Sequence, residues 1–191
     1  MMNNRAFLVM FCLWSVCAQA ELSIQITQGV DNPIPIAIVP FAWEGDGILS
    51  EDIDQIVMDD LQQVGEFRAL SPGNMLSLPN EEKEVFFRDW RVLAQDYLLV
   101  GKINRATGSQ LVRVQYELFG INRELKLAGE ILTGSVTQLR DIGHEISNVV
   151  FELVTGTRGA FTTQILYIVS EQSAGDQAVF RLEKADYDGQ R

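Results

Sequence analysis

Residues 34–43 read Ile-Pro-Ile-Ala-Ile-Val-Pro-Phe-Ala-Trp. Every residue between Pro35 and Pro40 is apolar, whichever side of the chain it faces, which is typical of a strand covered on both faces. Because proline has no amide hydrogen to give a sheet ladder, the two prolines fit the ends of such a strand and not its middle. Residues 34–43 therefore predict the first core strand of a globular domain.

The first twenty residues have the pattern of a secretory signal peptide. A basic residue and a mostly apolar run precede Ala18-Gln19-Ala20, a small-x-small cleavage site. We therefore expect cleavage between Ala20 and Glu21 and export of the mature chain to the periplasm or the exterior. A lipoprotein leader that uses Cys17 is the alternative, but the residues before this cysteine are a poor context for lipid attachment. No later stretch is long and apolar enough to predict a membrane helix.

Composition narrows the function classes. The 191 residues are 47% apolar and 21% charged, which predicts one folded domain of ordinary size plus a remnant. Both cysteines, Cys12 and Cys17, leave with the signal peptide, so the mature chain has no disulfide and depends on its core. The formal net charge is −11, and an acidic surface repels nucleic acid and anionic lipid but suits a basic protein partner.

Downstream of residue 43, the patterns predict an α/β unit and then antiparallel strands. Apolar residues at helical spacing predict helices over residues 50–64, 84–94 and 137–154. Ser50 is the expected N-cap of the first helix and Gly65 its stop. The inner face of the second helix is expected to hold Val85, Phe86, Trp90 and Leu93. Strands are expected at residues 67–70, 97–103, 111–119, 125–134, 164–170 and 178–184.

The order of these elements predicts the architecture. A βαβ start is followed by strands with short connections, which predicts an antiparallel meander beside a parallel pair. The last two strands have no third partner, and an isolated hairpin is only marginally stable. We therefore expect residues 161–191 to begin a second, all-β domain.

The segment between the cleavage site and the core strand alternates cleanly. Its apolar side holds Leu22, Ile24 and Ile26, and its polar side holds Ser23, Gln25 and Thr27. The following residues, Gln28-Gly29-Val30-Asp31-Asn32-Pro33, form a hinge or turn. The pattern leaves two interpretations open: an edge strand of the chain's own sheet, or a strand that adds to the sheet edge of a partner.

The sequence has no catalytic constellation. The single histidine, His144, has no second histidine at metal-ligand spacing, and its neighbour Glu145 points away from it on a helix, so we expect a capping or surface role. The acids at positions 51, 52, 54, 59 and 60 predict a solvated helix face. We expect no enzymatic activity, no cofactor and no metal.

Other possible motifs are incomplete. Gly45-Asp46-Gly47 and Gly101-Lys102 lack the rest of a nucleotide-binding motif. Asp186 and Asp188 lack the further ligands of a calcium loop and indicate a hairpin turn. The two tryptophans after the leader, Trp43 and Trp90, are interpreted as core or rim residues.

Several motifs together resemble the TolB family of the Tol-Pal system. They are His144-Glu-Ile-Ser-Asn-Val-Val-Phe-Glu-Leu-Val-Thr-Gly-Thr-Arg-Gly-Ala-Phe161 with Ile165-Leu-Tyr-Ile168, Pro35-Ile-Ala-Ile-Val-Pro-Phe41, Asp60-Leu61 with Gly65 and Phe67, Asp96-Tyr-Leu-Leu-Val-Gly101, Tyr116-Glu-Leu-Phe119 and Asp186-Tyr-Asp-Gly189. The resemblance runs from the leader to the last residue. Two positions depart from it: Asn148 stands where the family has Asp, and Gln164 where it has a basic residue.

The resemblance implies an α/β fold, with a mixed β-sheet packed with two to three helices, that continues into a six-bladed β-propeller. The implied units are a signal peptide (residues 1–20), an N-terminal tail (21–33), the α/β domain (34–160) and the first strands of a truncated propeller (161–191).

The resemblance also implies a periplasmic, non-enzymatic adaptor. Such proteins link the inner-membrane protein TolA to the outer-membrane lipoprotein Pal, and they support outer-membrane integrity and constriction during cell division. The TolA C-terminal domain is expected to bind the tail, through Glu21, Leu22, Ser23, Ile24, Gln25, Ile26, Thr27, Gln28, Gly29, Val30, Asp31 and Asn32. Pal is expected to bind the propeller. The chain is expected to be a monomer that reaches membranes only through protein partners.

Two other classes stay open. One is a periplasmic α/β domain that binds a small ligand, and the other is an accessory domain of a propeller hydrolase.

Overall fold

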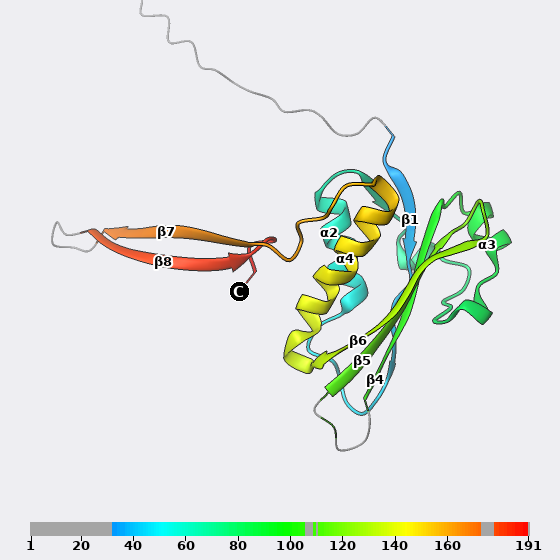
Figure 1. The fold of residues 1–191 in the computed structure, drawn as a ribbon, viewed down its shortest axis with the longest axis horizontal. Coiled ribbons are helices and arrows are strands. Elements are labelled where there is room, and N and C mark those ends of the chain that lie inside the picture. The colour runs from blue at the N-terminus through cyan, green and yellow to red at the C-terminus, as the bar shows by residue number, and fades with distance from the viewer. Residues whose placement is uncertain (1–31, 106–108, 110, 173–177, 191) are drawn as a thin grey trace, which may run out of the picture.

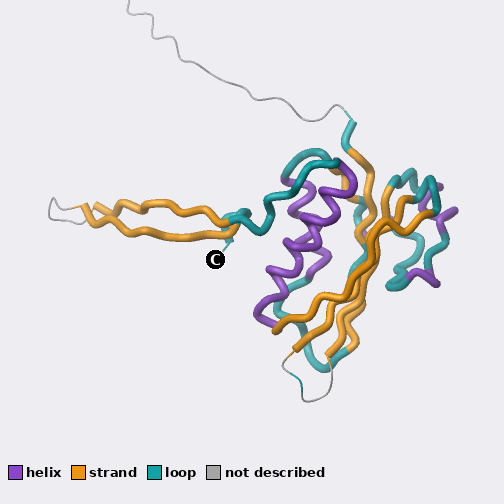
Figure 2. The backbone as a smooth tube through the Cα atoms, viewed as in Figure 1, coloured by secondary structure: helices purple, strands orange, loops and turns teal. Residues whose placement is uncertain are grey.

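The computed structural model describes residues 32–105, 109, 111–172 and 178–190. Its main body is a single mixed sheet with two longer helices on one face and short helical turns and loops on the other (Figures 1 and 2). A two-stranded hairpin extends away from this body on the side of the longer helices (Figure 1). The predicted mixed sheet with helices is confirmed, whereas the predicted signal peptide and nearly all of the tail lie outside the described residues.

The sheet combines a parallel half with an antiparallel half. Its strands are β1 (Ile34–Ile38), β2 (Ala42–Glu44), β3 (Phe67–Ala69), β4 (Tyr97–Arg105), β5 (Leu111–Gly120) and β6 (Leu125–Ser135). The order is β3-β1-β4-β5-β6, with β2 beside β4. Strand β1 is parallel to β3 and β4, whereas β4, β5 and β6 form an antiparallel meander, as predicted.

The stretch at residues 34–43 forms two short strands rather than one. Pro40 lies in the break between β1 and β2, which ends β1 as predicted. Pro35 is instead the second residue of β1, where its carbonyl accepts a hydrogen bond from the Asp96 amide at 3.0 Å. A proline is tolerated there because β4 begins only at Tyr97, opposite Ile36, so the amide that Pro35 lacks would lie before the start of the β1–β4 ladder.

Among the residues that the structure describes, three α-helices and three 3-10 turns complete the body. The helices are α2 (Ile53–Gln63), α3 (Phe87–Val92) and α4 (Leu139–Thr155), and the turns are η1 (Pro72–Asn74), η2 (Glu82–Glu84) and η3 (Val136–Gln138). Helix α2 begins after Asp52 and not after the predicted Ser50. Gly65 and Gly156 follow α2 and α4 at φ values of +77° and +75°, the left-handed conformation that ends many helices.

The predicted helix over residues 84–94 is shorter than expected. Residue Phe86 is extended, so α3 starts at Phe87, three residues later than predicted, and Phe86 is 66% exposed rather than part of the inner face. Phe87 packs inward instead, with its ring edge-on to Phe119 at a centroid distance of 5.9 Å. Two adjacent phenylalanines fit nearly the same helical periodicity, so the sequence alone does not show which of them packs against the core.

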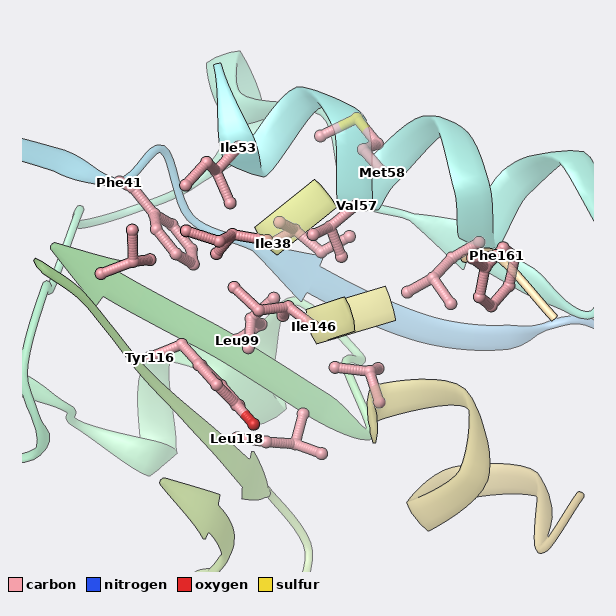
Figure 3. Packing of buried hydrophobic residues seen from close by; sticks show 14 of the residues in the cluster. Ile38, Phe41, Ile53, Val57, Met58, Leu99, Tyr116, Leu118, Ile146 and Phe161 are labelled. Carbon is pink, nitrogen blue, oxygen red and sulfur yellow. The ribbon is translucent and has the colours of Figure 1, made fainter. Parts of the chain in front are cut away.

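The hydrophobic core has a part on each face of the sheet. Ile36 and Ile38 of β1 face the helices α2 and α4, whereas Ala37 and Val39 face the side of α3. All four side chains are fully buried. Figure 3 shows Ile38 and Phe41 between α2 and the sheet, close to Leu99 of β4. Because β1 is covered on both faces, both of its sides must be apolar, as its sequence predicts.

The hairpin consists of β7 (Gln164–Gln172) and β8 (Ala178–Asp186), which pair antiparallel from Gln164 opposite Asp186 to Gln172 opposite Ala178. Its exposed apolar residues are Ile165, Leu166, Tyr167, Ile168, Val179, Phe180 and Leu182. Exposed apolar side chains on a two-stranded ribbon are typical of strands that pack against further strands. The hairpin thus agrees with the prediction of a second β unit that begins near residue 161.

Gly101 of β4 offers a test of this packing. A Cβ atom at Gly101 would lie 2.4 Å from the ring of Phe41, whereas a Cβ atom at Gly73 would meet no atom within 4 Å. We expect Gly101→Ala to lower the free energy of unfolding by about 1–3 kcal/mol, as overpacked core sites do. Gly73→Ala, the matched control, should change it by less than about 0.5 kcal/mol. Urea denaturation followed by tryptophan fluorescence measures both, and equal stability of the two variants would contradict this account of the core.

Candidate functional site at the junction of helix α4 and the hairpin

The predicted partner-binding tail joins the fold at the start of β1. Of its residues, only Asn32, which is exposed, and Pro33 are described; residues 21–31 lie outside the described residues. At Ile34 the backbone joins the sheet, because the Ile34 amide donates to the Glu66 carbonyl at 2.8 Å. Any force on the tail would therefore act on the central strand of the parallel half of the sheet.

A buried His–Asp pair lies between α2 and α4. The Nδ1 atom of His144 is 2.8 Å from Oδ2 of Asp60, and the two side chains are only 3% and 2% exposed. A carboxylate can only accept hydrogen bonds, so Nδ1 carries the hydrogen and donates a hydrogen bond to Asp60. The other ring nitrogen, Nε2, is buried and has no hydrogen-bond partner within the described residues.

The close approach of the two helices makes this pair possible. Gly143 precedes His144, and a Cβ atom at Gly143 would lie 2.8 Å from a methyl carbon of Ile56. The absence of a side chain at this position lets α4 come near enough to α2 for His144 to reach Asp60. Burial raises the pKa of Tyr187, which lies just beyond β8, and the negative charge of Asp60 raises this pKa further.

The structure corrects two predictions here. His144 does not have a capping or surface role, because it is buried in the helix interface. Asp60 is not part of a solvated helix face, although Asp52 and Asp59 are exposed as predicted. Asp54 is intermediate: its carboxylate accepts the Phe41 amide at 3.1 Å, while burial raises its pKa. Asp60 stands at helical spacing from Ile56 and Val57, which is the one sequence signal of its burial.

Arg140 of α4 forms an ionic contact with the end of the hairpin. Its guanidinium pairs with Asp188 and lies 3.9 Å from the Asp186 carboxylate and 3.7 Å from that of Glu51. The side chain of Arg140 is only 13% exposed. Asp186 and Asp188 therefore take part in a structural network around an arginine, and the predicted turn after β8 is present.

A row of aromatic rings runs from the sheet to the same junction. Phe67 of β3 contacts Phe151 of α4, Phe151 contacts Phe161, and Phe161 contacts Tyr187, with centroid distances of 6.0, 5.7 and 5.4 Å. The last two contacts are edge-to-face, a favoured aromatic geometry. The hairpin is thus joined to the body by apolar as well as ionic contacts.

Asn148, one departure from the expected family pattern, contacts the segment that leads into β7. Its side-chain oxygen accepts the Phe161 amide at 3.0 Å, and its side-chain nitrogen donates to the Thr162 hydroxyl at 3.1 Å. An aspartate could accept the first hydrogen bond but could not donate the second. The amide therefore holds the segment that leads into β7 at two adjacent points.

The junction also contains a small cavity. It has a volume of about 160 Å³, and the residues that line it include Asp141, His144, Phe161, Gln164 and Asp186.

The other candidate residues lie outside this junction. The predicted core or rim tryptophans lie elsewhere: Trp90 is 1% exposed, and Trp43 is half-buried. Within the described ranges, no three His, Cys, Asp or Glu side chains are grouped so that they could hold a metal ion. No helix of the described residues is long and apolar enough to cross a membrane.

The fold and the junction define an α/β domain that continues into a β unit. Residues 22–127 match the TolB amino-terminal domain, and the chain belongs to this family. A relative named Tol-Pal system protein TolB, from Hahella chejuensis, is 42% identical over 190 residues, which cover 100% of this chain and 44% of the relative. A protein of the same name from Pseudomonas aeruginosa is 40% identical over 187 residues, which cover 98% of this chain and 43% of the relative.

A solved structure agrees with this assignment. The crystal structure of TolB from Acinetobacter baumannii matches with a TM-score of 0.69 and 26% sequence identity, over 87% of this chain and 39% of that chain. The chain thus spans less than half the length of the relatives that it matches. The family resemblance read from the sequence is confirmed.

The His144–Asp60 pair predicts a difference between neighbouring acids of α2. Asp60→Ala should lower the free energy of unfolding by about 1–3 kcal/mol, because it leaves the buried Nδ1 proton of His144 without an acceptor. Asp59→Ala removes the same charge from an exposed position and should change it by less than about 0.5 kcal/mol. Chemical denaturation compares the two variants. Equal effects would mean that the buried pair does not stabilise the α2–α4 interface.

Proposed function

We propose that the chain is the N-terminal part of a periplasmic adaptor of the Tol-Pal system. Its support is membership of the TolB amino-terminal domain family, with relatives that are named Tol-Pal system proteins. In this proposal residues 1–20 are a signal peptide, 21–33 a partner-binding tail and 34–160 the α/β domain, and residues 161–191 begin a β-propeller. The adaptor connects TolA of the inner membrane with Pal of the outer membrane, and so supports outer-membrane integrity and constriction during cell division.

The tail binds the TolA C-terminal domain by strand addition. Its alternating apolar residues, Leu22, Ile24 and Ile26, would pack on the partner while its backbone hydrogen bonds to a sheet edge. The formal net charge of −11 favours a basic partner surface and gives attraction that salt weakens. The hinge at residues 28–33 separates this strand from the sheet, which the backbone joins at Ile34.

The energy of such a contact is finely balanced. Burial of each of the three apolar side chains contributes about 1.5–3 kcal/mol, whereas ordering each tail residue costs about 1–2 kcal/mol. These terms nearly cancel over the six or seven residues of the strand, so main-chain hydrogen bonds and charge attraction decide the sign of the binding free energy. A contact of this kind forms and dissociates readily, as suits a link that is made and broken during division.

Pal binding is assigned to the propeller. The exposed apolar residues of β7 and β8 support a continuation into further strands, because a hairpin of this kind needs neighbours to cover it. The proposed role is non-enzymatic.

Face-specific variants of the tail test the proposal. In the purified mature protein, one variant replaces the apolar side of the strand (Leu22→Ser, Ile24→Ser and Ile26→Ser), and its matched control replaces the polar side (Ser23→Ala, Gln25→Ala and Thr27→Ala). We expect the first to weaken binding to the TolA C-terminal domain by more than about tenfold, since each buried apolar side chain contributes about 1.5–3 kcal/mol. The control should bind like the parent protein. Isothermal titration calorimetry at two salt concentrations measures both.

Three outcomes are decisive. Equal binding by both variants and by a chain that lacks residues 21–32 would place the site on the folded domain. Equal loss in both variants would refute a one-sided strand. Failure of the parent protein to bind would remove TolA as the partner of the tail.

A further inference from the structure

The cavity at the junction of α4 and the hairpin has a volume of about 160 Å³. A water molecule needs only about 10–15 Å³ of such volume, so there is room for a small organic group. His144 lines this cavity and is 2% exposed, and its Nε2 atom has no partner within the described residues. A buried polar atom without a partner is costly, and its position beside a cavity points to a group that binds there.

The polar side chains around the cavity already use donors in other hydrogen bonds, so most of the groups left for a ligand are hydrogen-bond acceptors. Since Nδ1 of His144 donates to Asp60, the second ring nitrogen, Nε2, is an acceptor in the neutral form of the ring. The side-chain nitrogen of Gln164 donates to Asp186 at 3.4 Å, which leaves its carbonyl oxygen as an acceptor. The hydroxyl of Thr163 donates to the Ala160 carbonyl at 2.6 Å, so its oxygen can only accept further bonds. A matching ligand must therefore be a donor.

The charges select a cation. The carboxylates of Asp141 and Asp186 line the cavity, and that of Asp60 lies directly behind His144. Each carboxylate has about four acceptor positions, so contacts made elsewhere do not exhaust it. Arg140 brings one positive charge near the cavity, but this charge is shared by Glu51, Asp186 and Asp188. Within the described residues, Arg140 thus supplies one guanidinium to several carboxylates at the junction.

The shape of the lining distinguishes between cations. Phe161 adds an aromatic ring to the wall of the cavity. The hydrogen-bond acceptors of the cavity come from α4 and from the segment that leads into the hairpin. A guanidinium is planar, carries five N–H donors in fixed directions and stacks on aromatic rings, whereas an ammonium is a compact charge with strong hydration. We propose that this cavity is a binding site for a guanidinium group, with His144 Nε2 and the carboxylate of Asp141 among its acceptors.

Methylguanidinium is the probe for this site. His144 is the only histidine of the chain, so the Nε2 resonance of histidine-labelled protein, prepared without a histidine tag, is unambiguous. At constant ionic strength, we expect methylguanidinium to shift this resonance saturably, with a Kd on the order of millimolar for so small a ligand. Urea, a neutral molecule of nearly the same shape, should cause no saturable shift. Absence of a shift with methylguanidinium, or equal shifts with urea, would overturn the proposal.

A matched pair of variants on α4 tests the role of charge. Asp141 and Glu152 are both exposed and lie three turns apart on the same side of the helix, but only Asp141 lines the cavity. Asp141→Asn should weaken methylguanidinium binding by about tenfold, and Glu152→Gln should leave it unchanged. Equal affinities in the two variants would contradict the assignment.

The source of the guanidinium is read from a second probe. N-acetyl-arginine amide that binds as well as methylguanidinium would indicate an arginine side chain of a partner protein. Binding of methylguanidinium alone would indicate a free small cation. The proposal is independent of TolA binding by the tail, because the titration involves neither the tail nor a partner domain.

Discussion

The structure depends on the burial of β1 on both of its faces. Strand β1 has parallel neighbours on both edges, so its backbone hydrogen bonds to β3 and to β4. Its side chains alternate between the two parts of the core. A strand in this position requires cover above and below the sheet. Helices α2 and α4 provide it on one face, and α3 with its flanking turns provides it on the other (Figure 2). The remaining elements follow from this requirement, since a parallel pair such as β1 and β3 needs a crossover helix between its strands.

Most of the fold was predictable because its signals are local. The apolar stripes of α2 and α4, the alternation along β5 and the glycines at positions 65 and 156 each fix an element without knowledge of its neighbours. The prediction failed where a local signal was nearly degenerate. Phe86 and Phe87 fit the same helix with a shift of one residue, and only the contact of Phe87 with Phe119 in the folded chain separates them.

The candidate site was much harder to predict because its contacts are distant in sequence. Asp60 and His144 are 84 positions apart, and polar residues within helices are usually exposed. Their burial depends on the close approach of two helices at Gly143, which no single helix reveals. The role of Arg140 likewise depends on where the hairpin ends. The tail at residues 21–33 stays a prediction: its alternation is local, but the preference for a partner strand over an edge strand rests on the family resemblance.

Helix α4 is the element that joins these parts. One side of it covers the sheet through Ile146 and Val150, and another contacts α2 through Gly143 and His144. Arg140 and Asn148, at different turns, contact the end of the hairpin and the segment that enters it. A shift of α4 relative to α2 would therefore change the buried His–Asp pair and the placement of the hairpin together. Because the same helix packs on the sheet that contains β1, the hairpin and the attachment point of the tail are held by one continuous core.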